Sequence, residues 1–149
     1  MESYIGIKVI EAKPMTRGDY NKYRGWQIPS DENPADEGYL VVYEGDYESW
    51  SPKDVFEKVY HKSGEMSFSE ALYTARHFGA KISRAGWNGK KQYITVATHF
   101  EYDDSTGHNK ANHKTSHSAA LVFHGTFGDQ VGWLASQADM LSDDWCIVE

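Results

Sequence analysis

The chain has 149 residues, of which 40% are hydrophobic, so it can bury a core in one ordinary domain or in two small ones. Its net charge of −7 and its pI near 5.4 argue against a nucleic-acid binder that works by neutralising phosphates, since that mode needs a basic surface. A small charged ligand in a local pocket stays open.

Cysteine content and hydropathy indicate the compartment. The one cysteine, Cys146, cannot form an intrachain disulfide and is expected in a final strand, so a reducing cytosol is the natural environment. No apolar run approaches the roughly 20 residues that span a bilayer, and a signal-peptide pattern is missing at the N-terminus. The aromatic content of 14% suits stacking against flat ligands as well as a core.

The first part of the chain predicts a small α+β unit. Residues 3–12 alternate and are β-branched, which indicates a strand that ends at Pro14. Thr16 is placed to cap a helix that Gly25 would stop. The further elements expected here are a loop at 28–38, a strand at 39–43, its short hairpin partner at 47–50, and a helix that starts at Ser51 and Pro52 and docks on this sheet.

A second unit is predicted from Met66 onward, because His61 to Gly64 breaks the pattern of the preceding helix. We therefore divide the chain into residues 1–64 and 65–149. Ser67 and Glu70 have the spacing of a capping box, and Gly79 would end that helix. The further elements expected here are strands at 81–84, 93–97, 119–124 and 144–148, a long polar loop at 100–118, a turn at 126–130 with 131–134 in its hairpin, and a helical turn at 138–141.

The first candidate binding cluster follows the strand at 81–84. Trp87, Asn88 and Gly89 stand at its end, where small residues let a ligand approach the backbone. The indole can stack on a purine, Asn88 can hydrogen-bond a base or ribose, and Arg84 can meet a phosphate. The alternative is that Trp87 is a hydrophobic anchor in an ordinary turn and that Arg84 forms a structural ion pair.

The second candidate cluster lies near the C-terminus. Trp133 offers another aromatic plate, Ser136 and Gln137 offer neutral hydrogen-bonding groups, and Asp139 can accept from ribose hydroxyls. The alternative is that Ser136 and Asp139 cap a helical turn, while Trp145 fills the core. We predict that the two clusters meet in one ligand pocket.

Catalytic and metal signatures are sparse. His108, His113 and His117 have spacings that fit a zinc site only loosely, so no metal site is assigned. The chain has no Gly-x-Ser-x-Gly, phosphate-binding loop, His-Glu-x-x-His or deaminase signature. We therefore interpret the protein as a binder and assign it no catalytic residues.

Three blocks of residues 66–149 resemble the second Thoeris anti-defence family of phage proteins, which sequester a cyclic nucleotide signal. The blocks are Met66-Ser67-Phe68-Ser69-Glu70-Ala71-Leu72, Arg84-Ala85-Gly86-Trp87-Asn88-Gly89-Lys90, and Trp133 to Trp145. The resemblance implies a compact α+β domain with an antiparallel sheet, assembled as a homotetramer with pockets between subunits. It implies a glycocyclic ADP-ribose as ligand, and in some members cyclic dinucleotides as well. We predict no cofactor.

The combined prediction is an α+β protein of small antiparallel sheets, each packed with a helix. Residues 1–64 are an accessory domain of unknown role, and residues 65–149 are a sponge domain acting in the cytoplasm of the infected bacterial host. The predicted ligand-binding residues are Arg84, Trp87, Asn88, Gly89, Trp133, Ser136, Gln137 and Asp139. The alternatives left open are a nucleotide-processing enzyme that uses the histidine-rich loop, and a phage module that binds a host protein.

Overall fold

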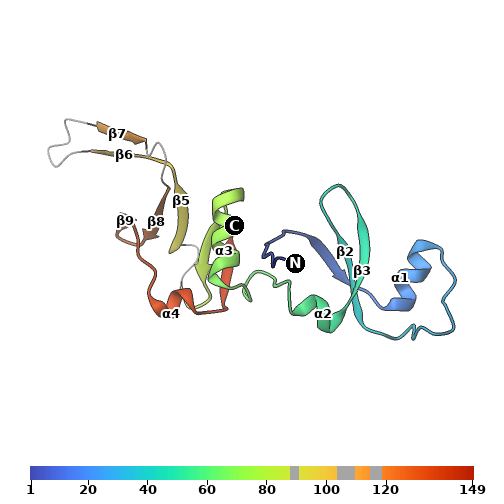
Figure 1. The fold of residues 1–149 in the computed structure, drawn as a ribbon. Helices are drawn as coiled ribbons and strands as arrows, with labels where there is room; N and C mark the ends of the chain where they lie inside the picture. Colours follow the sequence, from blue (N-terminus) through green and yellow to red (C-terminus); the bar gives the residue numbers. More distant parts are fainter. Residues whose placement is uncertain (88–90, 104–109, 115–118) are drawn as a thin grey trace. The chain divides into compact units, whose positions relative to one another are not determined.

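The computed structural model describes residues 1–87, 91–103, 110–114 and 119–149, and the backbone alone of 100–103 and 110–114. It divides into two compact units, Met1–His61 and Lys62–Glu149. Both combine antiparallel sheet with helix, so the α+β class predicted from the sequence is confirmed (Figure 1). No helix in the described ranges is long and apolar enough to cross a membrane.

The first unit contains a three-stranded antiparallel sheet in the order β1-β2-β3. Its strands are β1 (Glu11–Pro14), β2 (Gly38–Val42) and β3 (Glu48–Pro52), and its helices are α1 (Arg17–Arg24) and α2 (Lys53–Glu57). Helix α2 docks on the sheet as predicted, with Phe56 stacked on Tyr39 at a ring-centroid distance of 4.1 Å. The buried residues Tyr20, Leu40, Val41 and Phe56 form its core.

The second unit is built on a five-stranded antiparallel sheet in the order β10-β4-β5-β8-β9. Its strands are β4 (Lys81–Arg84), β5 (Tyr93–Ala97), β8 (Ala120–Gly125), β9 (Gly128–Val131) and β10 (Trp145–Val148), and its helices are α3 (Phe68–Phe78) and α4 (Gln137–Met140). Helix α3 packs on one sheet face through Ala71 and Ala75, which meet Ile82, Ile94 and Trp145 in the core.

The predicted ends of α1 and α3 are confirmed by their capping geometry, whereas α2 begins later than predicted, because Ser51 and Pro52 pair with β2 as part of β3 and α2 has no side-chain cap. The Thr16 hydroxyl accepts from the Asp19 amide at 3.1 Å, and Gly25 ends α1 in the left-handed conformation. Ser67 and Glu70 form the predicted capping box at the start of α3. These ends follow from local chemistry, which explains why the sequence alone identified them.

Two further segments differ from their predictions. Residues 3–10 were expected to be strand, but only Glu11–Pro14 pairs with β2, because the Cα partner of Glu11 is Val42, the last residue of β2. Residues 100–118 were expected to be a loop, whereas β6 (His99–Asp103) and β7 (Lys110–Lys114) pair as an antiparallel ribbon (Figure 1). Each difference reflects whether a partner strand is available, which local sequence does not report.

The hairpin after β8 is also tighter than predicted. The turn occupies Thr126 and Phe127, and Gly128 already belongs to β9. Residues 126–130 were expected to turn and 131–134 to pair, so the returning strand begins earlier in the chain. This shift places Gln130 opposite Phe123 in the sheet.

Candidate ligand-binding site

Arg84 lies at the end of β4, where β10 brings a carboxylate beside it. The Arg84 Nε and Nη2 donate to the two Asp144 carboxylate oxygens at 2.9 and 3.3 Å, and Nη1 donates to Asp139 Oδ1 at 3.0 Å. These contacts use three of the five N–H groups of the guanidinium. Arg84 therefore forms the structural ion pair that the sequence left open, and within the described residues these carboxylates leave two of its N–H groups unused.

The ion pairs set the charge states of this cluster. Hydrogen bonds to Asp144 and then to Asp139 raise the pKa of the Arg84 guanidinium above its usual value. Burial alone would raise the pKa of the Asp139 carboxyl, but hydrogen bonds from Ser136 and Arg84 outweigh it and lower that pKa. These hydrogen bonds therefore favour the charged forms of Arg84 and Asp139.

Ser136 and Asp139 form a capping box on α4, which is the structural alternative considered from the sequence. The Ser136 hydroxyl and amide donate to Asp139 Oδ2 at 2.8 and 3.1 Å, and the Asp139 amide donates back to the Ser136 hydroxyl at 3.1 Å. Gln137 is exposed at the first position of the helix. The cap thus fixes the polar residues that were predicted to meet a ligand.

Four aromatic rings pack together beside this polar network. Trp87 makes edge-to-face contacts with Phe123, Trp133 and Trp145 at centroid distances of 5.5, 5.9 and 5.6 Å. Trp133 also lies nearly parallel to Phe123, with a centroid distance of 6.4 Å and an interplanar angle of 20°. Trp87 and Trp133 are half-buried, so each ring is both part of the packing and accessible at the surface.

Trp145 connects the aromatic and polar parts. Its side chain is completely buried, as the sequence indicated, and its Nε1 donates to the backbone oxygen of Asp139 at 2.8 Å. Its ring contacts Trp87, and its neighbour Asp144 holds Arg84. The structure thereby brings the two predicted clusters together, while Asn88 and Gly89 lie outside the described residues.

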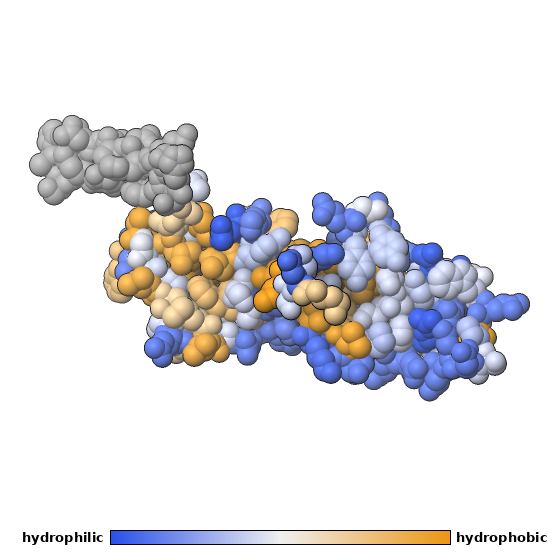
Figure 2. Space-filling model, in the orientation of Figure 1, coloured by the Kyte–Doolittle hydropathy of each residue, from blue (hydrophilic) through white to orange (hydrophobic). Residues whose placement is uncertain are grey.

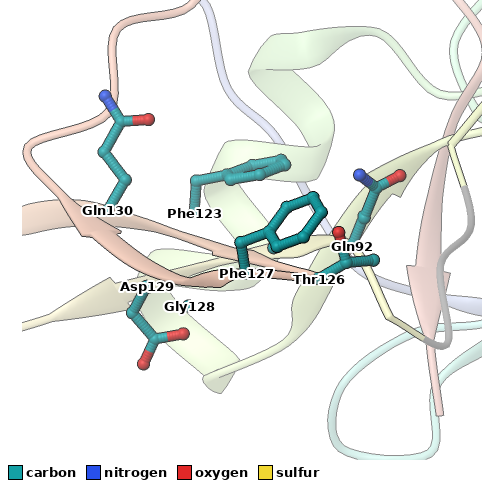
Figure 3. A pocket seen from close by; sticks show the side chains of 8 residues that line it. Gln92, Phe123, Thr126, Phe127, Gly128, Asp129 and Gln130 are labelled. Atoms are coloured by element: carbon teal, nitrogen blue, oxygen red, sulfur yellow. The ribbon is translucent and has the colours of Figure 1, made fainter.

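A hollow of about 390 Å³ adjoins the aromatic rings on the β8–β9 hairpin. Its lining includes Phe123, the ring shared with Trp87 and Trp133, together with Gln92, Phe127 and Gln130 (Figure 3). Sequence reasoning missed these residues, because their proximity depends on the pairing of β5, β8 and β9. The one local signal was the aromatic residue between two glycines, at Phe127.

Exposed apolar side chains gather over the same part of the second unit. Figure 2 shows hydrophobic surface over the region of β8, β9 and α4. Among its members Phe127 and Leu134 are 105% and 88% exposed, and Val131, Met140 and Leu141 are exposed as well. A patch of this kind beside a hollow marks a surface that meets a ligand or another protein.

The histidines do not assemble a metal centre in the described ranges, where no group of three His, Cys, Asp or Glu is placed to hold an ion. His108 and His117 lie outside the described residues, as does the side chain of His113. His124 is held instead between Thr95 Oγ1 at 2.8 Å and Asp129 Oδ1 at 2.9 Å, and it stacks on Tyr93.

The second unit is thus a small α+β domain whose aromatic and ionic clusters meet beside a surface hollow lined by both polar and aromatic side chains. Residues 66–148 match the family described as the Thoeris anti-defense 2-like domain, and the chain belongs to this family. A curated relative named Thoeris anti-defense 2, from Bacillus phage SP01, is 29% identical over 86 residues, covering 56% of this chain and 96% of the relative. These findings confirm the resemblance drawn from the sequence blocks.

Proposed function

We propose that this chain is a phage anti-defence protein that binds and sequesters a glycocyclic ADP-ribose signal without cleaving it, and so blocks Thoeris immunity in the cytoplasm of the infected bacterial host. The observation that carries the proposal is the family match over residues 66–148. The name of the phage relative supports the anti-Thoeris role. Cyclic dinucleotides are a second ligand class for the same protein.

In this proposal the ligand lies over the surface where the two clusters meet. Trp87 and Trp133 stack on its flat parts, since both rings are half-buried and positioned by Phe123. Among the described residues, Arg84 donates three of its five N–H groups to Asp139 and Asp144. Its other two N–H groups meet a phosphate oxygen of the ligand.

The remaining polar contacts come from both clusters. Asn88 and Gly89, which follow Trp87 in the sequence, are assigned to the ligand as predicted, and Ser136, Gln137 and Asp139 approach it from the start of α4. Asp139 accepts from ribose hydroxyls, and its oxygens are already oriented by Arg84 and Ser136. A site whose groups are oriented before binding loses less entropy when the ligand arrives.

We further propose that residues 65–149 form the sponge domain, that residues 1–64 form an accessory domain, and that the protein is a homotetramer. Support for association comes from the exposed apolar side chains of Val131, Leu134, Met140 and Leu141, within the hydrophobic surface over β9 and α4 (Figure 2). Its exposed members are suited to burial against another copy of the chain. The mass of the protein in solution measures this directly.

A release experiment tests sequestration against chemistry. The protein is incubated with the product of the bacterial TIR-domain enzyme, the free ligand is removed, and the complex is heated. Sequestration predicts that the intact messenger returns to solution, with one ligand-sized peak by chromatography and mass spectrometry. A hydrolysed product would establish a nucleotide-processing enzyme instead, and failure of every cyclic nucleotide to bind would favour a module for a host protein.

Substitution of the two tryptophans tests the position of the site. Trp87→Ala and Trp133→Ala should each weaken messenger binding by about 1–3 kcal/mol, because a stacking ring is lost. Trp26→Ala, which removes a tryptophan 52% exposed in the first unit, is the matched control and should bind normally. Normal messenger binding by a folded Trp87→Ala and Trp133→Ala double variant would remove this assignment.

A further inference from the structure

We propose that the hollow on the β8–β9 hairpin is a subsite for a flat, uncharged nucleobase, with Phe127 as a stacking ring and Gln92 and Gln130 as its hydrogen-bonding partners. The inference rests on the proposed function, because the base belongs to the sequestered nucleotide. It adds residues outside the predicted set and assigns them the recognition of one chemical part of the ligand.

The geometry of the hairpin places these side chains on one side of the sheet. In Figure 3 the side chains of Gln92, Phe123, Phe127 and Gln130 lie on the same side of the hairpin, and Asp129 points to the other. The register agrees, since Phe123 and Gln130 are directly opposite each other. The volume of about 390 Å³ is near the lower end of the range of about 300–1,000 Å³ for ligand pockets, which suits one portion of a nucleotide.

The two phenylalanine rings of the hollow differ in how they are held. Phe123 is fixed by its contacts with Trp87 and Trp133, whereas Phe127 is 105% exposed at the tip of the hairpin. A bare phenylalanine is unfavourable in water, and covering its face with a base removes that apolar surface from solvent. One ring therefore gives the hollow a rigid wall, and the other gives it an uncovered stacking face.

The charges of the lining identify the part of the ligand that fits. The described residues that line the hollow include no lysine or arginine, and the one ionisable group among them, Asp129, is paired with His124. Among these described residues a phosphate finds no cationic partner. The amides of Gln92 and Gln130 each present both a donor and an acceptor, which is what the edge of a base requires.

Phe123 makes the hollow continuous with the rest of the proposed site. The ring lines the hollow and also contacts Trp87 and Trp133, so a ligand can extend from one to the other. Gly125 preserves this arrangement, because a Cβ at that position would lie 2.9 Å from the Phe123 ring. In this arrangement the base occupies the hollow on the β8–β9 hairpin, and the charged portion of the ligand lies toward Arg84.

The experiment compares Phe127→Ala with Phe127→Tyr and with Phe78→Ala, which removes another exposed phenylalanine at the end of α3. Calorimetry with the cyclic ADP-ribose messenger should show a loss of affinity of about 5–150-fold for Phe127→Ala, the equivalent of one stacked base. Phe127→Tyr and Phe78→Ala should bind like the wild type. In saturation-transfer NMR, the adenine protons of the bound messenger should receive less saturation in Phe127→Ala.

Three results would overturn the inference. If the wild type binds the messenger and Phe127→Ala binds it equally well, the base lies elsewhere and the proposed function stands. If Phe127→Ala changes the mass of the protein in solution together with affinity, Phe127 is a subunit contact. If the wild type binds no cyclic nucleotide, the proposed function fails, and the subsite is tested with adenosine instead. Saturation transfer to the adenine protons that occurs with the wild type and disappears with Phe127→Ala would support the subsite. If the wild type transfers no saturation to adenosine, the subsite is ruled out.

Discussion

Two glycine-tryptophan turns in this chain look alike in sequence and differ in structure. In the first unit Gly25 ends α1, and Trp26 remains 52% exposed, with the Arg24 guanidinium 4.9 Å from its ring centroid and Tyr20 at its edge. In the second unit Gly86 precedes Trp87, whose ring meets three other aromatic rings. The similarity is confined to the dipeptide.

The difference shows that the surroundings, and not the turn, decide what a tryptophan does. Trp26 finds its partners within the same helix and its cap, at Tyr20 and Arg24. Trp87 finds its partners on β8, on the segment before α4 and on β10, which the sheet brings together. Trp26 also lines a hollow, of about 430 Å³, but it is the one aromatic residue among the described residues of that lining, whereas Trp87 belongs to a packed aromatic cluster in the part of the chain that matches the family.

The largest expected effect of a substitution is at the centre of the aromatic cluster. Trp145→Ala should reduce the free energy of unfolding of the second unit by about 3–5 kcal/mol, because it opens a cavity and leaves the Asp139 carbonyl without its indole donor. Amide hydrogen exchange of β4 and β5 measures the loss. Trp26→Ala should cost less than about 1.5 kcal/mol in the exchange of α1. Equal costs would mean that the two turns are energetically alike.

Local signals in the sequence were sufficient for most elements of the fold. The ends of α1 and α3 followed from Thr16, Ser67 and their glycine stops, whose hydrogen bonds involve residues three to five positions away. The predictions for residues 3–10 and for the β6–β7 ribbon were wrong, because a strand depends on a partner segment and not on local sequence alone. A strand exists only with a partner: β2 ends too early to extend β1, while His99–Asp103 pairs with Lys110–Lys114 despite its polar composition.

The candidate site was predictable only in part. The density of tryptophan and small polar residues located the two clusters, and the structure joins them through Trp145. The sequence left open whether Arg84 forms a structural ion pair or meets a ligand, since its partners Asp144 and Asp139 lie 60 and 55 residues away along the chain. Phe123 was missed as a site residue because its role comes from the register of β8 with its neighbours.

A second effect, of intermediate size, tests the ionic cluster of the second unit. Asp139→Asn should lower its free energy of unfolding by about 1.5–3 kcal/mol at neutral pH, since charge-assisted hydrogen bonds from Arg84 and Ser136 are weakened. Asp143→Asn, an exposed carboxylate nearby, is the matched control and should change stability by less than about 0.5 kcal/mol. Calorimetry measures these differences from the unfolding transition of the second unit, which is the transition that Trp145→Ala should shift to a lower temperature.

The difference in unfolding free energy between the wild type and Asp139→Asn should decrease as the pH falls. The pKa of Asp139 is lowered in the folded protein, so its contribution is present above the ordinary aspartate pKa of about 3.9 and is lost as the pH falls through the native value. The wild type and Asp139→Asn should therefore converge in stability below about pH 3.9. A difference that stays constant from neutral to acidic pH would show that Asp139 acts through packing and not through its charge.

The smallest expected effects on stability come from replacing the glycine before each tryptophan, Gly25 or Gly86. Gly25 has φ of +72°, so Gly25→Ala forces an L residue into the left-handed conformation and should destabilise α1 by about 1–2 kcal/mol. Gly86 is outside that region, and a Cβ there would meet no atom of the described residues within 4 Å, so Gly86→Ala should stay within about 0.5 kcal/mol of the wild type. Hydrogen exchange of α1 and of β4 reports each change. If Gly86→Ala leaves stability intact but weakens messenger binding, then the glycine before Trp87 serves close approach of the ligand, whereas the glycine before Trp26 serves the end of a helix.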